Sequence, residues 1–244
     1  MIIAQGIYYS LIISGDLGKI LRKRKIITED EARIYLAEVL LALDYLHDHD
    51  IIFRDLKPEN VMIDREGHAM LTDFGLAKEG ITDSSCTKTF CGSRCYLAPE
   101  VITRSGHNKS VDWYLFGLMT YEMLAGAPPY YSPDREQYFK NVKSGVLKIP
   151  KSLSADVKDL IQKLLDRSPK TRLGAGPNGA NDIKSHPWFK TIDWTKVVDR
   201  KLKPPKPILE RVEAKMEGID YFKAETKAYN KIENWTILGE DNES

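Results

Sequence analysis

The sequence predicts an α+β fold that is mainly helical and carries one small β-hairpin. Thr28-x-x-Glu31 is a capping box, and apolar residues recur behind it at helical spacing, so a long helix is predicted there. Two short apolar runs, 61–64 and 69–72, are separated by Arg-Glu-Gly-His, which is typical of a hairpin. The sequence contains no internal repeat, and 244 residues are enough to bury one substantial core, so their number predicts one compact domain followed by a tail.

The other elements follow from local patterns. Residues 7–13 are rich in β-branched and aromatic residues and predict a strand, which Ser-Gly-Asp at 14–16 closes as a turn. Residues 17–25 predict a short basic helix. Later helices are predicted at 111–124, 136–144, 155–166 and 182–189. From 202 onward, Pro-Pro-Lys-Pro indicates an extended linker and tail.

The composition argues against several classes of function. The chain has 36 Lys and Arg against 35 Asp and Glu, so charge alone favours neither a nucleic acid nor an anionic membrane as partner. No apolar run reaches the length of a membrane-spanning helix. Cys86, Cys91 and Cys95 form an odd cluster without a signal peptide, which favours a reducing compartment, and we expect a cytoplasmic location. Because their spacing lacks the paired C-x-x-C form, free thiols are favoured over a zinc site with His107.

Three short motifs occur in a fixed order. Phe-Arg-Asp-Leu-Lys-Pro-Glu-Asn occupies 53–60, Asp-Phe-Gly follows the hairpin at 73–75, and Ala-Pro-Glu stands at 98–100. The last two flank a loop at 77–99, and loops of that length inside a domain are usually functional. Each motif alone is weak evidence. Together, in this order and spacing, they resemble the protein-kinase signature of catalytic loop, metal-binding Asp and activation segment.

Phosphoryl transfer, the chemistry that this resemblance implies, depends mainly on positioning and charge neutralisation. Oxygen atoms of Asn60 and Asp73 suit Mg²⁺, which prefers carboxylate and amide ligands. Asp55 is expected to orient the substrate hydroxyl or accept its proton. Lys57 would add a positive charge near the transferred group and favours Ser/Thr over Tyr as acceptor.

A closer resemblance rests on longer stretches of sequence. The chain resembles the AGC group of Ser/Thr kinases, and within it the protein kinase B and ribosomal-protein kinase branch, in IIFRDLKPENVMID, LTDFGLAKEG, TFCGS, YLAPE, SGHNKSVDW and RLGAG. The resemblance runs from about residue 7 to about residue 207. It implies a protein-kinase-like fold in which 1–13 is a remnant of the small-lobe sheet and hinge, 14–190 is the large C-terminal lobe, and 191–244 is a C-terminal extension.

The resemblance also implies a site for ATP and Mg²⁺. Its residues are Ser10, Ile12, Asp16, Glu59, Met62, Thr72 and Asp73. Backbone groups at 10–12 would meet the adenine as the hinge. Asp16 falls where the family places an acid on the ribose, Met62 would pack beneath the adenine, and Thr72 would lie beside it.

Regulatory and structural roles follow from the same resemblance. Thr89 matches the activation-loop phosphosite, and its phosphate would pair with Arg54 and order the loop. Ser93 stands where the family bridges the catalytic Asp and Lys. Three further residues match structural positions, namely Glu100 and Arg172 as an ion pair and Asp112 as the anchor of the catalytic-loop backbone.

The expected partners are protein substrates and an upstream activating kinase, with no nucleic acid, no integral membrane contact and a monomeric chain. Substrates with upstream arginines are expected because three acids fall where relatives present carboxylates to them: Asp16, Glu59 and Glu122. Each acid could also be an ordinary surface residue.

One departure from the family leaves two hypotheses open. No G-x-G-x-x-G loop precedes residue 7, and the family's V-A-I-K lysine and its partner Glu are missing from the sequence. The first hypothesis is the catalytic lobe of an ATP-dependent Ser/Thr kinase, whose small lobe a full gene would supply. The second is a non-catalytic scaffold, or a partial gene product, that keeps the substrate-docking lobe. For the 244-residue chain alone we expect no kinase turnover, because the phosphate clamp is absent.

Overall fold

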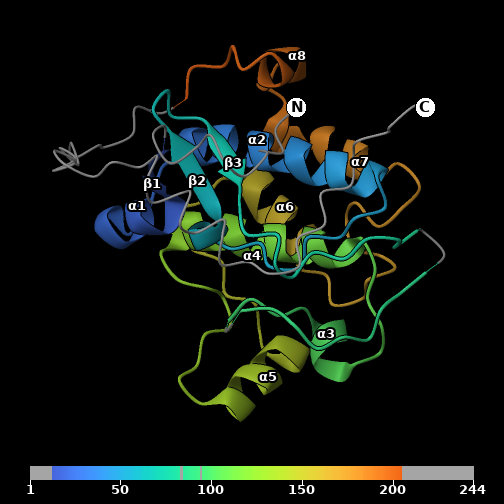
Figure 1. Ribbon diagram of the computed structural model, residues 1–244. Coiled ribbons are helices and arrows are strands. Elements are labelled where there is room, and N and C mark those ends of the chain that lie inside the picture. Colours follow the sequence, from blue (N-terminus) through green and yellow to red (C-terminus); the bar gives the residue numbers. More distant parts are fainter. Residues whose placement is uncertain (1–12, 83–84, 94, 205–244) are drawn as a thin grey trace, which may run out of the picture. The chain divides into compact units, whose positions relative to one another are not determined.

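The computed structural model describes residues 13–82, 85–93 and 95–204 (Figure 1). All described residues belong to one compact unit. Within the described residues the strands are β1 (Ile13–Asp16), β2 (Val61–Asp64) and β3 (Ala69–Leu71). The α-helices are α1 (Leu17–Arg24), α2 (Glu29–Asp48), α3 (Pro99–Thr103), α4 (Ser110–Ala125), α5 (Arg135–Ser144), α6 (Ala155–Leu164), α7 (Ala180–Lys184) and α8 (Trp194–Val198), with 3₁₀ helices η1 (Pro58–Asn60) and η2 (Pro187–Phe189). The predicted mainly helical α+β class with one hairpin is confirmed.

The described strands form a small antiparallel sheet in the order β1-β2-β3. The hairpin predicted at 61–72 is confirmed, with Met62 opposite Met70. The turn predicted at 14–16 is wrong, because these residues belong to β1 and pair with β2. A register shift between Ile13 and Gly15 absorbs the irregularity, and Gly15 takes a φ of 131°, which a residue with a side chain rarely adopts. Almost all of the strand predicted at 7–13 lies outside the described residues.

Helices α2 and α4 form the centre of the core, and Figure 1 shows them stacked one above the other. The predicted capping box starts α2: the amide of Glu31 donates to Thr28 Oγ1, and the Glu31 carboxylate accepts from the amide of Thr28. Helix α4 is buried on nearly all sides, because α2 and α6 pack against it. Because α4 is buried on nearly all sides, it gives rigid support to the loop at residues 53–60, which is hydrogen-bonded to its first turn.

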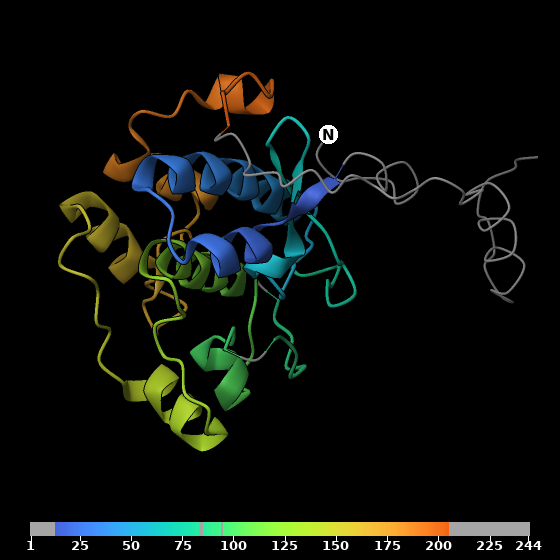
Figure 2. The ribbon, with the colours of Figure 1, turned by 90° about the vertical axis from the view of Figure 1, so that its left-hand side faces the viewer.

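Helix α1 lies beside the sheet and η1 (Figure 2), which brings the start of the described chain next to the catalytic loop, residues 53–60. Helices α3 and α5 lie together in the lower part of Figure 1. The activation segment, residues 73–100, runs between the hairpin and α3. None of the helices in the described ranges is long and apolar enough to cross a membrane.

Several helix boundaries differ from the sequence expectations. The helix predicted at 182–189 is split into α7 and η2, because Pro187 cannot continue an α-helix. Helix α6 ends at Leu164 rather than at residue 166. Helices α3 and α8 were not predicted, since five residues are too few for a periodic signal. Helix α8, which falls within the segment assigned to the extension, packs against α2.

Candidate active site

Helix α4 fixes the backbone of the catalytic loop. Asp112, in the first turn of α4, is fully buried, and its carboxylate accepts hydrogen bonds from the amides of Phe53 (2.8 Å) and Arg54 (2.7 Å). His47 of α2 lies 2.8 Å from the same carboxylate through Nε2. Arg54 has a φ of 68°, an uncommon backbone conformation for a residue with a side chain. The two hydrogen bonds that Asp112 accepts hold the loop in this conformation.

Three side chains converge on the carboxylate of Asp55. Its Oδ1 accepts from Ser93 Oγ at 2.8 Å, and its Oδ2 accepts from Lys57 Nζ and from Asn60 Nδ2, both at 2.9 Å. Lys57 Nζ also donates to Ser93 Oγ at 2.6 Å. The predicted catalytic residues and Ser93 therefore form one connected cluster, although Ser93 comes from the activation segment. Such a network holds the carboxylate in a single orientation.

The two residues expected to bind metal are held next to each other. The amide of Thr72 donates to the backbone oxygen of Asn60 at 3.0 Å, and Asp73 follows Thr72 directly. Both hydrogens of the Asn60 amide are donated to Asp55, so its oxygen is the atom left to bind a cation. Asp73 is exposed and offers carboxylate oxygens. This oxygen donor set fits Mg²⁺, which binds one or two protein side chains together with substrate phosphates.

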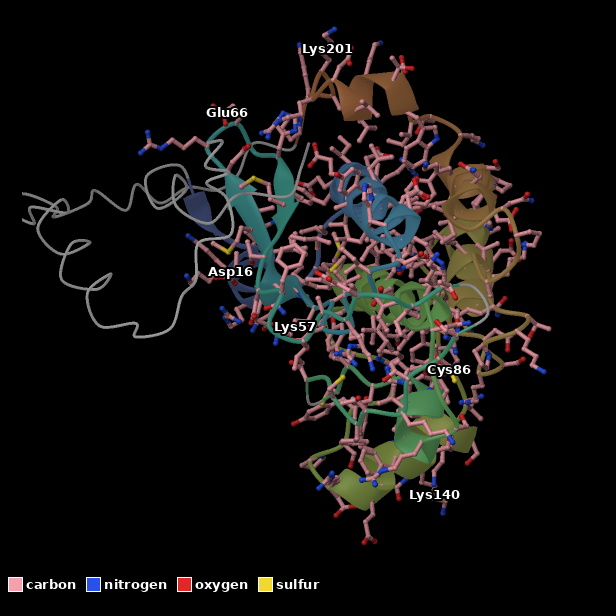
Figure 3. All side chains as sticks on the ribbon, turned by 45° about the vertical axis from the view of Figure 1, so that its right-hand side comes forward. Asp16, Lys57, Glu66, Cys86, Lys140 and Lys201 are labelled. Atoms are coloured by element: carbon pink, nitrogen blue, oxygen red, sulfur yellow. The ribbon has the colours of Figure 1, made fainter. Side chains whose placement is uncertain are left out.

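Asp16 and Met62, two of the residues predicted to contact the nucleotide, are partners across the β1–β2 pair. Asp16 also caps α1, because its Oδ1 accepts from the amide of Lys19 at 2.7 Å. Figure 3 shows Asp16 and Lys57 at the same edge of the described structure. Ser10 and Ile12, the other expected nucleotide contacts, lie outside the described residues.

Comparison with known proteins decides the family. Residues 7–189, well over half of the chain, match the protein kinase domain family. The chain belongs to the protein kinase family. It is 47% identical to ribosomal protein S6 kinase 2 alpha of Gallus gallus over 78% of this chain and 25% of the relative. It is 45% identical to RAC-beta serine/threonine-protein kinase A of Xenopus laevis over 78% of this chain and 39% of the relative.

A third relative is ribosomal protein S6 kinase alpha-3 of Homo sapiens, with 46% identity over 82% of this chain and 27% of the relative. The chain thus spans between a quarter and two fifths of the length of these relatives. The expected AGC Ser/Thr kinase membership is confirmed. ATP and Mg²⁺ are the cofactor and metal that protein kinases use in general.

In this kinase domain, Glu100 and Arg172 form a buried ion pair. Arg172 Nη1 and Nη2 donate to the two carboxylate oxygens of Glu100 at 2.6 and 3.0 Å, and Nη1 also donates to the backbone oxygen of Ser110 at 2.8 Å. The arginine and glutamate are 2% and 3% exposed. The pair therefore ties the end of the activation segment to the start of α4.

The three acids expected to contact substrate arginines have different surroundings. Arg22 of α1 bridges two of them, with Nη1 3.3 Å from Glu59 Oε1 and Nη2 3.5 Å from Asp16 Oδ1. Glu122 instead accepts a short hydrogen bond from the hydroxyl of Tyr96. Burial raises the pKa of Glu122, and the nearby Glu59 raises it further, while the Tyr96 hydrogen bond opposes this rise. No role was predicted for Arg22 or for Tyr96, although Tyr96 is the first residue of the YLAPE stretch.

Thr89 is exposed on the activation segment, and its Oγ1 lies 3.3 Å from Oγ1 of the buried Thr87. Lys78 Nζ donates to the Thr87 hydroxyl at 2.8 Å. Arg54 Nε donates to the backbone oxygen of Leu76 at 2.6 Å. The expected pairing of Arg54 with a phosphate on Thr89 stays a prediction. Lys78 and Thr87 were not predicted as part of this region, because Lys78 was noted only as a member of the LTDFGLAKEG stretch and Thr87 lies outside the stretches that carry the resemblance.

Cys86, Cys91 and Cys95 form no disulfide in the described part of the chain. Within the described ranges, no group of three or more His, Cys, Asp and Glu side chains could hold a metal ion. The alternative of a zinc site formed by the cysteines and His107 therefore has no support in the described residues.

Proposed function

We propose that this kinase domain transfers the γ-phosphoryl group of ATP to Ser or Thr of protein substrates that carry upstream arginines. It acts as a cytoplasmic monomer, and an upstream kinase activates it by phosphorylating Thr89. In that activation the Thr89 hydroxyl oxygen takes the γ-phosphoryl group of a second ATP, with loss of its proton and release of ADP. The cluster of three cysteines without a disulfide among the described residues supports the proposed reducing compartment.

The observation that carries the proposal is the convergence of Lys57, Asn60 and Ser93 on Asp55. A carboxylate held by three donors can orient a substrate hydroxyl and accept its proton as the phosphoryl group transfers. The ammonium group of Lys57, 2.9 Å from this carboxylate, is close enough to stabilise negative charge on that group. These contacts support a catalytic role for the cluster.

Asn60 and Asp73 would hold Mg²⁺, which when bound neutralises charge on the phosphates. Asp16 and Met62 would contact the nucleotide from β1 and β2. The convergence of Asp16 and Glu59 on one guanidinium, that of Arg22, supports the preference for arginine in substrates.

The test uses the 244-residue chain and a two-lobe fusion, in which the small lobe of the Xenopus relative precedes this chain. Transfer of radiolabelled phosphate from Mg-ATP to a serine peptide with upstream arginines is measured. We expect turnover from the fusion and none from the chain alone. Asp55→Asn should lower kcat of the fusion about 10²- to 10⁴-fold, the range for losing a general base.

Asp48→Asn is the matched control, since Asp48 is an exposed residue at the end of α2. It should leave turnover unchanged. A folded fusion without activity, or an Asp55→Asn fusion as active as the unmodified one, would contradict the proposed function.

A further inference from the structure

Two buried nitrogen atoms near the activation segment have no hydrogen-bond partner among the described residues: Arg54 Nη1 and His107 Nε2. The two residues are 9% and 3% exposed. Native proteins leave few buried polar atoms unpaired, because such a group has given up water without gaining a partner. Two unpaired nitrogens in one region point to an acceptor that binds there in another state of the protein.

The backbone places His107 directly opposite Thr87. The two residues exchange backbone hydrogen bonds, each of 2.9 Å, as an isolated antiparallel bridge. Residues paired in this way carry their side chains on the same face of the bridge, a few ångströms apart. The Thr87 hydroxyl in turn lies 3.3 Å from the hydroxyl of Thr89. His107 is therefore on the face of the activation segment that leads to Thr89.

The surroundings of His107 are rich in positive charge. Burial lowers the pKa of His107, and the cations Arg54 and Lys78 lower it further, while Glu100 and Asp112 oppose them. Lys78 donates to the Thr87 hydroxyl at 2.8 Å, so its ammonium group is held beside the two threonines. Arg54 donates its other nitrogens to backbone oxygens at residues 76 and 77. A phosphate bound here would therefore have two cations, Arg54 and Lys78, close to it.

We propose that His107 is a ligand of the phosphate on Thr89, with Nε2 donating to a phosphate oxygen beside Arg54 Nη1 and the Lys78 ammonium group. This inference rests on the proposed phosphorylation of Thr89 and adds a phosphate-binding residue from the segment before α4. Thr87 is buried and Thr89 is exposed, so the exposed threonine is the one that a modifying enzyme can reach. Docking of its phosphate would give both unpaired nitrogens an acceptor.

The proposal has a consequence for the charge of His107. Without the phosphate, burial and the two cations favour the neutral ring. A phosphate carries a charge of about −1.5 to −2 near pH 7 and favours the protonated ring when it is close. Phosphorylation should therefore raise the pKa of His107 by about 1 unit or more, the size of shift that an adjacent opposite charge produces.

The experiment uses the 244-residue chain with and without phosphothreonine encoded at position 89. NMR of histidine labelled with ¹³C and ¹⁵N follows the imidazole of His107 between pH 5 and 9, and ³¹P NMR follows the phosphate. In the phosphorylated chain the His107 pKa should rise, and the second pKa of the phosphate should fall below the value of about 6 for a free phosphate ester. This comparison needs no substituted variant. If the pKa of His107 is the same with and without the phosphate, the inference is wrong.

Variants provide the second measurement. His107→Leu should raise the second pKa of the phosphate toward the free value and speed its removal by a phosphatase several-fold. His107→Gln keeps a neutral donor and should restore part of the phosphatase protection. His49→Leu is the matched control, because His49 is an exposed histidine at the end of α2, and it should change neither quantity.

Arg54→Gln distinguishes a failure of the proposed role of Thr89 from a failure of the proposed role of His107. A phosphate that titrates like free phosphothreonine in the unmodified chain and in every variant would contradict the proposed role of Thr89 itself. A phosphate signal that responds to Arg54→Gln but not to His107→Leu would overturn the role of His107 and leave the proposed function standing.

Discussion

The hydroxyl of Ser93 donates a 2.8 Å hydrogen bond to the carboxylate of Asp55, and the same hydroxyl accepts a 2.6 Å bond from Lys57. Residue 93 belongs to the activation segment, whereas residues 55 and 57 belong to the catalytic loop. The side chain of Ser93 therefore makes the position of the Asp55 carboxylate depend on the conformation of the activation segment. In the proposed mechanism, a change in that segment alters the rate without any change in residues 53–60.

Removing this hydroxyl should slow the reaction. In the two-lobe fusion, we expect Ser93→Ala to lower kcat about 5- to 150-fold, which corresponds to losing an oriented hydrogen bond worth about 1–3 kcal/mol. Ser93→Thr keeps the hydroxyl and should retain most of the rate. Ser144→Ala, on the exposed end of α5, is the control for loss of a serine hydroxyl. Equal kcat for Ser93→Ala and the unmodified fusion would show that Asp55 needs no support from the activation segment.

The buried ion pair of Glu100 and Arg172 should contribute strongly to the free energy of unfolding. We expect Arg172→Ala to lower the free energy of unfolding by about 3–5 kcal/mol, because it leaves a buried carboxylate unpaired. The double variant Glu100→Leu with Arg172→Met should lose less, since it leaves no unpaired charge. Urea denaturation followed by circular dichroism measures both.

An exposed ion pair is the matched control for this prediction. Lys163 and Asp159 lie 2.6 Å apart with about half of each side chain exposed. Lys163→Ala should change the free energy of unfolding by no more than about 1 kcal/mol. If Arg172→Ala were no worse than Lys163→Ala, the buried pair would not be a stabilising anchor.

Local signals predicted most of the helices and the catalytic cluster. The capping box at Thr28 and Glu31 gave the start of α2, because capping depends on residues three positions apart. The motifs also placed Asp55 and Asn60 together, since both lie in one short loop. The turn predicted at 14–16 failed because pairing with a strand some 48 residues later outweighs a local turn preference.

Contacts between distant segments could not be predicted in the same way. Arg22 and Glu59 are 37 residues apart, and Tyr96 and Glu122 are 26 apart. Neither contact leaves a pattern in the sequence, because the two side chains of each pair come together only in the folded chain. The unpaired Nε2 of His107 is likewise visible only when burial and hydrogen bonding are known together.

The pair of His68 and Glu38 should make stability depend on pH. The hydrogen bond to Glu38 raises the pKa of His68, against the lowering effects of burial and Arg200. Because the folded-state pKa lies above the unfolded value of about 6.5, the stabilisation is fully present below pH 6.5. It is lost as the pH rises through the folded-state pKa. The difference in unfolding free energy between the unmodified chain and His68→Gln should therefore be largest near pH 5.5 and smaller at pH 8.5.

His49→Gln is the control for this measurement. Because His49 is exposed, its substitution should change the free energy of unfolding little at either pH. His107 should contribute with the opposite sign in the unphosphorylated chain, because its folded-state pKa is lowered. Its contribution is present above pH 6.5 and is lost as the pH falls. A stability difference for His68→Gln that grows from pH 5.5 to 8.5 would show that Glu38 does not hold a protonated His68.

Arg22 should compete with substrate arginines for Asp16 and Glu59. Its guanidinium lies 3.3–3.5 Å from both carboxylates, and a methyl group added to Gly18 would lie 3.1 Å from an oxygen of each. Two carboxylates this close to one point form a site for a single guanidinium. About three fifths of the Arg22 side chain is exposed, so it can leave without unpacking the core.

We therefore expect Arg22→Ala in the two-lobe fusion to lower KM about 2- to 5-fold for peptides with upstream arginines, which corresponds to removing the ion pairs of a largely exposed guanidinium, worth up to about 1 kcal/mol. KM for peptides without arginine should stay the same, and so should kcat for both. Arg65→Ala removes an equal charge at the exposed tip of the hairpin and is the control. A higher KM for the arginine peptides in Arg22→Ala would mean that Arg22 holds the two carboxylates in place for the substrate instead of competing with it.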